Sequence, residues 1–258
     1  MSKHSKKNNL SGFTLIEMAV VLTILALSAA GGLTILSKAI RAQKTDDTND
    51  KMEHIMSAIE AYVTEYGHLP CPTSSADGLG EEESGFGIGT ATNNCSSIPG
   101  GFKSAANNVV RGFVPVYTLK LSPDYFYDGW NRRFSYIVDE DLTSSAGFDA
   151  NTGSIDIQNS AGVTLTGGEL AAVLLISHGE RGHGAHRLKG ANPTQIDDGL
   201  TPPNYEEANG NENSAFDTLF RDVPHRNIDG GTDETDEPFD DYLMYRTQWQ
   251  LDPPPPLP

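Results

Sequence analysis

The sequence predicts an α+β protein in which one long N-terminal helix packs on an antiparallel sheet. Three features of the 258-residue chain favour this fold class. Residues 13–36 are a run of 24 mostly apolar residues, apolar side chains recur at helical spacing over residues 52–66, and short β-rich runs follow residue 108. An apolar segment that continues as an amphipathic one predicts a single long helix, and the later strands supply a surface for its apolar side.

The apolar run of residues 13–36 predicts a transmembrane helix. At about 1.5 Å per residue, its length matches a hydrocarbon core of ~30 Å. A secretory signal has a shorter apolar region followed by a small-residue cleavage site. Here the small residue, Gly12, precedes the run, and Lys3, Lys6 and Lys7 lie before it. A plain membrane anchor would explain the length of the run but not the acidic Glu17 inside it.

Glu17 requires a partner, because a charge deep in lipid costs on the order of 2.5–3.5 kcal/mol on insertion scales. The stretch Gly12-Phe13-Thr14-Leu15-Ile16-Glu17 resembles the cleavage and methylation signature of type IV prepilins and type II secretion pseudopilins. The resemblance implies that a prepilin peptidase cuts between Gly12 and Phe13 and methylates the new amine. It also implies that the helix later packs in a filament core, where the carboxylate of Glu17 pairs with the Phe13 amine of a neighbour.

The same resemblance implies a location and a topology. The chain would cross the inner membrane once, with its N-terminus in the cytoplasm and its head in the periplasm, before it enters a periplasmic or surface filament. The formal net charge is −17, and removal of the three leader lysines leaves 15 basic and 35 acidic residues, a net charge of −20. This balance argues against a nucleic acid as direct partner. It also disfavours docking of the head on anionic lipid.

The chain has two cysteines, Cys71 and Cys95. In an exported head, an isolated pair is usually a disulfide, and the alternative is two free thiols. The bond would close a loop of about 25 residues and contribute on the order of 3 kcal/mol in the chain-entropy model.

The helix is expected to continue past the apolar run as an amphipathic segment, residues 37–66. Gly31-Gly32 is either tolerated in lipid or marks a stretch that melts when the subunit leaves the membrane. The polar residues 45–50 favour a bend or a restart. Gly67 is the expected stop. The apolar positions of this segment are Met52, Ile55, Met56, Ile59, Val63 and Tyr66.

The expected domain order follows from these segments. It is a leader (residues 1–12), a membrane or filament-core helix (13–36), the amphipathic continuation (37–66), a periplasmic head (67–252) and a Pro-rich disordered tail (253–258).

Within the head, residues 72–108 and 189–213 are rich in turn residues and predict loops. The β-rich runs predict strands, and the continuous apolar run 171–176 predicts a buried central one. The candidate strands are residues 109–110, 113–116, 134–138, 154–157, 171–176 and 242–249.

The stretch Asp128–Tyr136 resembles the Asp-x-Trp-Gly-Asn-x-aromatic-x-Tyr segment that opens the sheet in major pseudopilins. Asn131 and Arg132 depart from that pattern, which has Gly and Asn there. The resemblance implies that Trp130 and the aromatic residues after it pack on the helix, so core packing is their expected role.

Two stretches contain groups that can bind metal. His178, Glu180, His183 and His186 lie within nine residues, but their spacing is not that of H-E-x-x-H, so we expect a surface or subunit-contact loop rather than a metal site. Late in the chain, Asp229, Asp233 and Asp236 lie in an oxygen-rich stretch, and calcium takes six to eight oxygen ligands. A solvated acidic loop is the alternative to a calcium site.

Together these features predict a structural subunit and not an enzyme, with calcium as the one candidate cofactor. It would be a minor pilin or pseudopilin of a type II secretion pseudopilus or a type IV pilus. Its partners would be the prepilin peptidase, other subunits, the inner-membrane assembly platform and the membrane. The alternative is a membrane-anchored exported enzyme or ligand-binding domain that uses the loop from His178 to His186.

Overall fold

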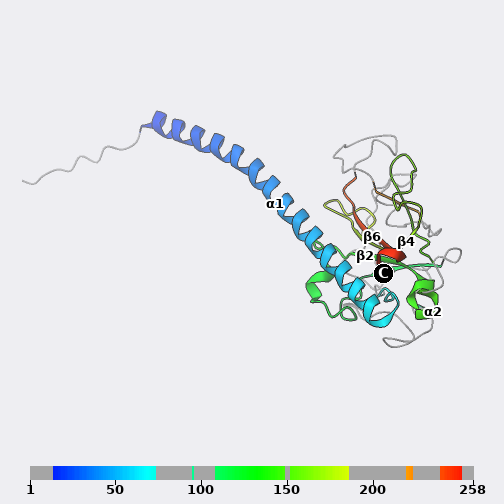
Figure 1. The fold of residues 1–258 in the computed structure, drawn as a ribbon. Coiled ribbons are helices and arrows are strands. Elements are labelled where there is room, and N and C mark those ends of the chain that lie inside the picture. The colour runs from blue at the N-terminus through cyan, green and yellow to red at the C-terminus, as the bar shows by residue number, and fades with distance from the viewer. Residues whose placement is uncertain are drawn as a thin grey trace, which may run out of the picture. The chain divides into compact units, whose positions relative to one another are not determined.

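The computed structural model describes residues 14–73, 95, 108–148, 152–185, 219–222 and 239–251. The chain divides into two compact units, residues 1–43 and 44–258. One helix, α1 (Leu15–Tyr66), contributes to both units (Figure 1). Its backbone is helical through Gly31-Gly32 and through residues 45–50, so of the two alternatives for the polar stretch, a bend or a restart, the restart does not occur. Neither stretch contains proline, and glycine and polar residues still donate the backbone N–H that a helix needs.

Helix α1 ends where the sequence predicts. Gly67 has a φ of +72°, a left-handed conformation that glycine adopts without a steric penalty. Its N–H donates to the carbonyl of Val63 at 2.7 Å, which is the hydrogen bond of an αL C-cap. The predicted helix stop is therefore confirmed.

The remaining elements belong to the second unit. In chain order they are β1 (Val109–Phe113), η2 (Pro123–Phe126), β2 (Ser135–Asp139), η3 (Glu140–Thr143), α2 (Ser145–Phe148), β3 (Asp156–Gln158), β4 (Ala171–Ser177), β5 (Leu219–Arg221), β6 (Tyr242–Thr247) and α4 (Gln248–Leu251).

A four-stranded antiparallel sheet is the centre of this unit. Its strand order is β1-β2-β4-β6, and β3 and β5 form a separate two-stranded parallel pair. The predicted α+β class, with a long helix and an antiparallel sheet, is confirmed. The central strand β4 is buried along all seven of its residues.

The apolar residues of β4 are buried because both faces of the sheet are covered. One face packs against α1, and the main core there includes Met52, Ile55 and Ile59 of the helix and Tyr136 of β2. The other face carries a second core, which the parallel pair β3–β5 helps to form. Its buried members are Val109, Ile137, Ile155, Ile157, Ala171, Leu174, Ile176 and Phe220. A strand that is covered on both faces has apolar side chains on both, which is why residues 171–176 do not alternate between apolar and polar.

Three strand predictions need correction. Strand β1 ends at Phe113, because Pro115 follows and cannot donate to a ladder. Residues 154–157 contribute β3 to the parallel pair rather than a strand to the main sheet. The last strand ends at Thr247, and the chain turns into α4, where Trp249 is 60% exposed. The short strand β5 was not predicted.

Candidate functional site

The first described residues form a cap on helix α1. The backbone N–H and the hydroxyl of Thr14 both donate to Oε2 of Glu17 at 2.8 Å. In return the N–H of Glu17 donates to Oγ1 of Thr14 at 3.3 Å. Thr14-x-x-Glu17 is therefore a capping box, in which the carboxylate satisfies a donor that the helix leaves open.

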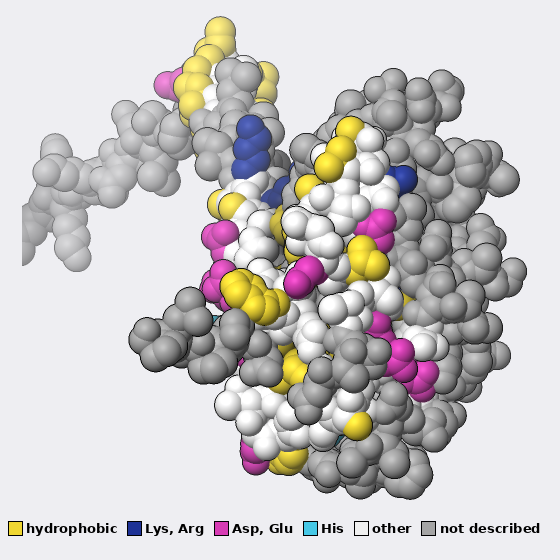
Figure 2. Space-filling view, turned by 45° about the vertical axis from the view of Figure 1, so that its right-hand side comes forward, with side chains coloured by type: hydrophobic (Ala, Val, Ile, Leu, Met, Phe, Trp, Pro, Cys, Tyr) yellow, Lys and Arg dark blue, Asp and Glu magenta, His cyan; other side chains and the backbone are white. Residues whose placement is uncertain are grey.

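The N-terminal turns of α1 expose large apolar side chains. Leu15 is 93% exposed and Ile16 is 74% exposed, and six more between Met18 and Leu25 are about half exposed. Figure 2 shows these side chains in yellow on the helix surface. Exposed apolar surface of this extent marks a site for protein or membrane contact. Within the described residues, no helix meets the combined length and hydropathy needed for a membrane span.

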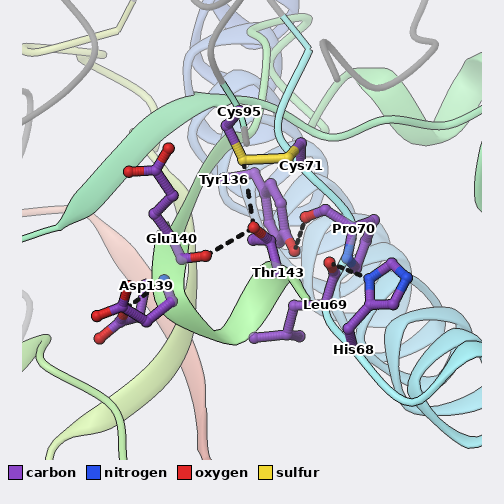
Figure 3. Close-up of a disulfide and its surroundings, with 10 residues drawn as sticks. His68, Leu69, Pro70, Cys71, Cys95, Tyr136, Asp139, Glu140 and Thr143 are labelled. Atoms are coloured by element: carbon purple, nitrogen blue, oxygen red, sulfur yellow. Dashed lines mark hydrogen bonds between the residues drawn. A yellow bond between two sulfur atoms is a disulfide. The ribbon is translucent and has the colours of Figure 1, made fainter. Parts of the chain in front are cut away.

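Cys71 and Cys95 form a disulfide with a Cα–Cα distance of 5.6 Å (Figure 3). Both residues are buried, at 3% and 0% exposed. The segment that carries Cys71 is held on the sheet by two contacts. Tyr136 of β2 donates its hydroxyl to the carbonyl of Pro70 at 2.9 Å, and Thr73 pairs with Phe113 of β1. The disulfide thus joins Cys95 to the end of α1 and to the edge of the sheet.

A row of polar side chains crosses the sheet on the face opposite α1. Arg111 comes from β1, Ser135 from β2, His178 follows β4, and Asp241 precedes β6. Arg111 donates to the Ser135 hydroxyl at 3.1 Å, and that oxygen lies 2.9 Å from Nε2 of His178. Nδ1 of His178 lies 3.5 Å from Oδ1 of Asp241. All four residues are at most 2% exposed.

The charges of this row compensate each other. Burial lowers the pKa of Arg111 to about 9, and the negative charge of Asp241 opposes that shift. The guanidinium is therefore still protonated at neutral pH, and a buried cation needs a counter-charge nearby. Asp241 supplies it, with Ser135 and His178 between the two charges. The row ties together all four strands of the sheet.

Ser135, His178 and Asp241 have the arrangement of a Ser-His-Asp triad, with the hydroxyl on one imidazole nitrogen and the carboxylate near the other. A nucleophilic serine needs a substrate carbonyl next to its oxygen. Ser135 is 1% exposed, and Arg111 already donates to its hydroxyl. As the strands are packed, the row is a structural network, and a substrate would reach Ser135 only if they separated.

The turn that follows η2 connects the sheet to helix α1. Oδ1 of Asp128 accepts the N–H groups of Trp130 and Arg132, and Oδ2 accepts the hydroxyl of Ser177 at 2.7 Å. Burial raises the pKa of Asp128 above its ordinary value, and these hydrogen bonds offset only part of that shift. The next residue, Gly129, donates its N–H to Thr48 of α1 at 2.9 Å. The turn therefore fixes the start of β2 to both β4 and α1.

The comparison with protein families concerns the N-terminus. A family model described as the prokaryotic N-terminal methylation motif matches residues 7–33. The chain carries the prepilin-type methylation motif. This motif is the signature of type IV pilins and pseudopilins, and the α+β architecture is consistent with a pilin-like fold. No significant match was found among curated proteins or among solved structures.

The matched methylation motif includes the predicted processing residues and Glu17. Gly12 and Phe13 lie outside the described residues, and Glu17 lies in the first turn of α1. The carboxylate of Glu17 is held by Thr14, a partner that the sequence interpretation did not consider. The capping-box pattern Thr-x-x-Glu was the available signal.

The histidine loop differs from its prediction. His178 is fully buried in the polar row and so is not part of a surface loop. His183 lies in a turn and is partly buried, and His186 lies outside the described residues. Among the described residues, no group of three or more His, Cys, Asp or Glu side chains is arranged to hold a metal ion. The candidate calcium ligands Asp229, Asp233 and Asp236 also lie outside the described residues.

The segment that resembles the pseudopilin sheet opening packs mostly as predicted. Phe134 and Tyr136 are fully buried in the core that contains α1. Trp130 is only partly buried and stacks on Tyr242 of β6, with ring centroids 5.7 Å apart. Asn131 has a φ of +67°, at the position where the pattern has glycine. Asparagine tolerates this left-handed conformation better than most residues, which explains how the turn survives the change.

Proposed function

We propose that this protein is a structural subunit of a pilin-type filament, made as a precursor and processed by a prepilin peptidase. The methylation motif at residues 7–33 carries this proposal. After cleavage between Gly12 and Phe13, the mature chain begins two residues before the helix that carries Glu17. The exported head then lies within the second compact unit, and its Cys71–Cys95 disulfide suits an oxidising compartment.

The exposed apolar side chains on the N-terminal turns of α1 suit two apolar environments, which the helix occupies one after the other. Before assembly they lie in the inner membrane, with the N-terminus cytoplasmic and the head periplasmic. After assembly they pack against the helices of other subunits in the filament. Either environment removes from water the apolar side chains between Leu15 and Leu25.

We assign the chain to a minor position in a type II secretion pseudopilus or a type IV pilus. The head is large, and the C-terminal region lacks the cysteine pair common in type IV major pilins. Its partners are the peptidase, the assembly platform and other pilin-type subunits. Deletion of the gene, with secretion, twitching and DNA uptake scored separately, distinguishes the filament systems.

N-terminal sequencing tests the central claim. Mature protein recovered from sheared filaments should begin at methylated Phe13. Assembled protein that still begins at Met1 would contradict the proposal. As a control, Gly12→Asp should leave the precursor uncleaved in the membrane while the Cys71–Cys95 disulfide still forms.

The triad arrangement of Ser135, His178 and Asp241 favours one alternative, an anchored hydrolase. A fluorophosphonate probe labels a serine that a histidine activates, and Ser135→Ala removes the target. No labelling of Ser135 in folded protein is expected from its burial. Labelling that Ser135→Ala abolishes would favour the hydrolase.

A further inference from the structure

Strand β6 forms one edge of the four-stranded sheet, because the strand order is β1-β2-β4-β6. Its inner side pairs with β4 from Tyr242 to Thr247. Its outer side has no neighbouring strand among the described residues. The backbone N–H and C=O groups on such a side can pair with another extended chain, so proteins usually cover or block them. The outer side of β6 is therefore a candidate interaction surface.

Alternate residues of β6 direct their backbone groups to this outer side. Two hydrogen bonds show which residues these are. The carbonyl of Tyr245 accepts a hydrogen bond from the guanidinium of Arg246 at 3.0 Å, and the N–H of Thr247 donates to the side-chain oxygen of Gln250 at 2.9 Å. These groups therefore face away from β4. Leu243 lies two residues before Tyr245, so its N–H and C=O also point outward.

The outer side of β6 is blocked at one end and open at the other. Arg246 and Gln250 occupy outward groups near Thr247. The N–H and C=O of Leu243 and the N–H of Tyr245 form no hydrogen bond with any other described residue. We call residues 243–245 the open edge. Its outward groups repeat at about 7 Å, which is the spacing of every second residue in an extended backbone. An extended polypeptide is therefore the ligand that fits.

The side chains beside the open edge differ between the two faces of the sheet. Leu243 and Tyr245 are partly buried and pack against the second core. On the other face, Glu60 of α1 forms an ion pair with Arg246 at 2.8 Å. Glu53 lies about two helical turns before Glu60 and so on the same side of the helix. Glu53 is exposed and forms no ion pair with another described residue. An extended segment on the open edge therefore meets apolar side chains on one face and a carboxylate on the other.

We propose that the open edge binds an extended peptide segment of another protein, which adds to the sheet beside β6. The backbone of this segment bonds to Leu243 and Tyr245, and its side chains alternate between the two faces. The residues opposite Leu243 and Tyr245 are apolar, and the residue between them is basic and lies toward Glu53. Such a contact goes beyond the proposed filament role, because it gives the head a docking site for a further partner.

Charge distinguishes this partner from a second copy of the chain. The strand that a second copy would offer, β6 itself, has Arg246 as its one basic residue, and that side chain already pairs with Glu60. A second copy would also bring its own Glu53, Asp240 and Asp241 to the same edge. The chain carries a formal net charge of −17, so two copies repel each other. A basic segment of another protein has neither disadvantage.

Peptide binding to variants of Leu243 tests the site. The probe is a fluorescent peptide of alternating valine and lysine with blocked ends, added to the detergent-solubilised full-length chain with its disulfide intact. Fluorescence anisotropy measures the Kd. Leu243→Pro removes an N–H that makes no bond within the sheet, so an edge strand tolerates it. It should weaken binding about thirty-fold, because the peptide carbonyl loses its donor. The matched control, Leu243→Ala, keeps the N–H and should change the Kd by less than about five-fold.

Changes in the peptide test the same contact without altering the protein. Methyl groups on the valine nitrogens remove the N–H groups that reach the carbonyl of Leu243 and should abolish binding. A peptide of alternating valine and glutamate should not bind, because it places carboxylates next to Glu53. Glu53→Lys should weaken binding of the lysine peptide about five-fold. The matched control is Glu65→Lys, at an exposed glutamate of α1 that pairs with Lys120 instead, and it should leave the Kd unchanged.

The outcomes decide between the possible occupants of the open edge. Absence of peptide binding by the wild-type chain, or equal binding by Leu243→Pro, overturns the proposal. A wild-type dimer that Leu243→Pro dissociates and the peptide leaves intact identifies a second copy as the occupant and also overturns it. Near-UV circular dichroism of the stacked Trp130 and Tyr242 confirms folding in each variant. The assay uses the unprocessed chain in vitro, so its result is independent of cleavage at Gly12 and of the proposed function.

Discussion

Ser135 Oγ lies 2.9 Å from Nε2 of His178 in a layer of the sheet that water does not reach. The two residues are 43 positions apart. Ser135 is the first residue of β2, and His178 directly follows the neighbouring strand β4. The same hydroxyl accepts a hydrogen bond from Arg111 of β1. One oxygen atom thus holds β1, β2 and the end of β4 together.

Ser135→Ala should lower the free energy of unfolding by about 1–3 kcal/mol, because it leaves two buried nitrogen atoms without this partner. Urea unfolding of the detergent-solubilised chain, followed by tryptophan fluorescence, measures the loss. The matched control is Ser160→Ala at an exposed serine, which should change stability by less than about 0.5 kcal/mol. Equal effects of the two substitutions would mean that the row does not stabilise the sheet.

Asp128 makes stability depend on pH. Burial raises its pKa in the folded chain, so between the ordinary aspartate value and the raised value the folded chain binds more protons than the unfolded one. The stability contribution of this group therefore increases as the pH falls through that window and is lowest above it. Asp128→Asn removes this dependence and keeps an oxygen for Trp130 and Arg132.

The measurement is the unfolding free energy of wild type and Asp128→Asn at several pH values. The difference between them should shift toward wild type as the pH falls, and a constant difference would contradict the argument. Asp128→Ala removes all three hydrogen-bond acceptor contacts and should cost about 2–4 kcal/mol, with a cost that increases as the pH falls.

Gly129→Ala should displace the turn from helix α1. A Cβ at this position would lie 2.3 Å from the carbonyl oxygen of Lys44, and backbone cannot move aside easily. We expect a loss of about 1–3 kcal/mol and weaker stacking of Trp130 on Tyr242, visible in near-UV circular dichroism. Gly67→Ala is a useful comparison, since no atom lies within 4 Å there and only the left-handed φ is unfavourable. It should leave the Trp130 signal unchanged.

Local patterns predicted the elements that pack through their own periodicity. The spacing of Met52, Ile55 and Ile59 identified the buried side of α1, and the unbroken apolar run of β4 identified a strand covered on both faces. The predictions were wrong or missing where a strand pairs with a strand that is distant in the sequence. Strand β5 has three residues and depends on β3, more than 60 positions earlier, for its partner.

The polar row was missed for a related reason. Arg111 lies on β1, Ser135 lies on β2 and Asp241 directly precedes β6, and no local spacing brings them together. Considered singly, each of these residues predicts a surface position, because arginine, serine and aspartate are mostly exposed in proteins. His178 was assigned to a surface or subunit-contact loop, in a stretch that contains several glycines. Glycine there serves a close approach instead, since a Cβ on Gly179 would meet the carbonyl oxygen of Asp240 at 2.1 Å.

Removal of the disulfide should destabilise the head without unfolding α1. Cys71→Ala with Cys95→Ala removes the cross-link between two residues that are 24 positions apart. A disulfide that closes a loop of that size contributes on the order of 3 kcal/mol to the free energy of unfolding. Mass spectrometry of exported protein without reductant should find the linked peptides in wild type. Each single substitution should lose the link and as much stability as the double one. Two alkylatable thiols in folded wild type would contradict this prediction.

Glu17 has two separable tasks, and two substitutions distinguish them. Its carboxylate completes the capping box with Thr14, and in the proposed filament it pairs with the amine of a neighbouring Phe13. Glu17→Gln keeps a side chain that can cap the helix but removes the charge. Glu17→Val removes both, and also the cost of placing a charge in lipid, so it should insert readily.

Both variants should be cleaved after Gly12, because the peptidase acts on the other side of Phe13 and mainly reads Gly12. If the charge is the assembly contact, both should fail to enter filaments, since an amine in a low-dielectric core is left without its counter-charge. If capping is what matters, Glu17→Gln should assemble and Glu17→Val should not. Thr14→Val, which weakens the cap but keeps the charge, should then behave like Glu17→Val. The measurement is the fraction of processed protein recovered in sheared filaments, and normal incorporation of Glu17→Val would show that Glu17 is not an assembly contact.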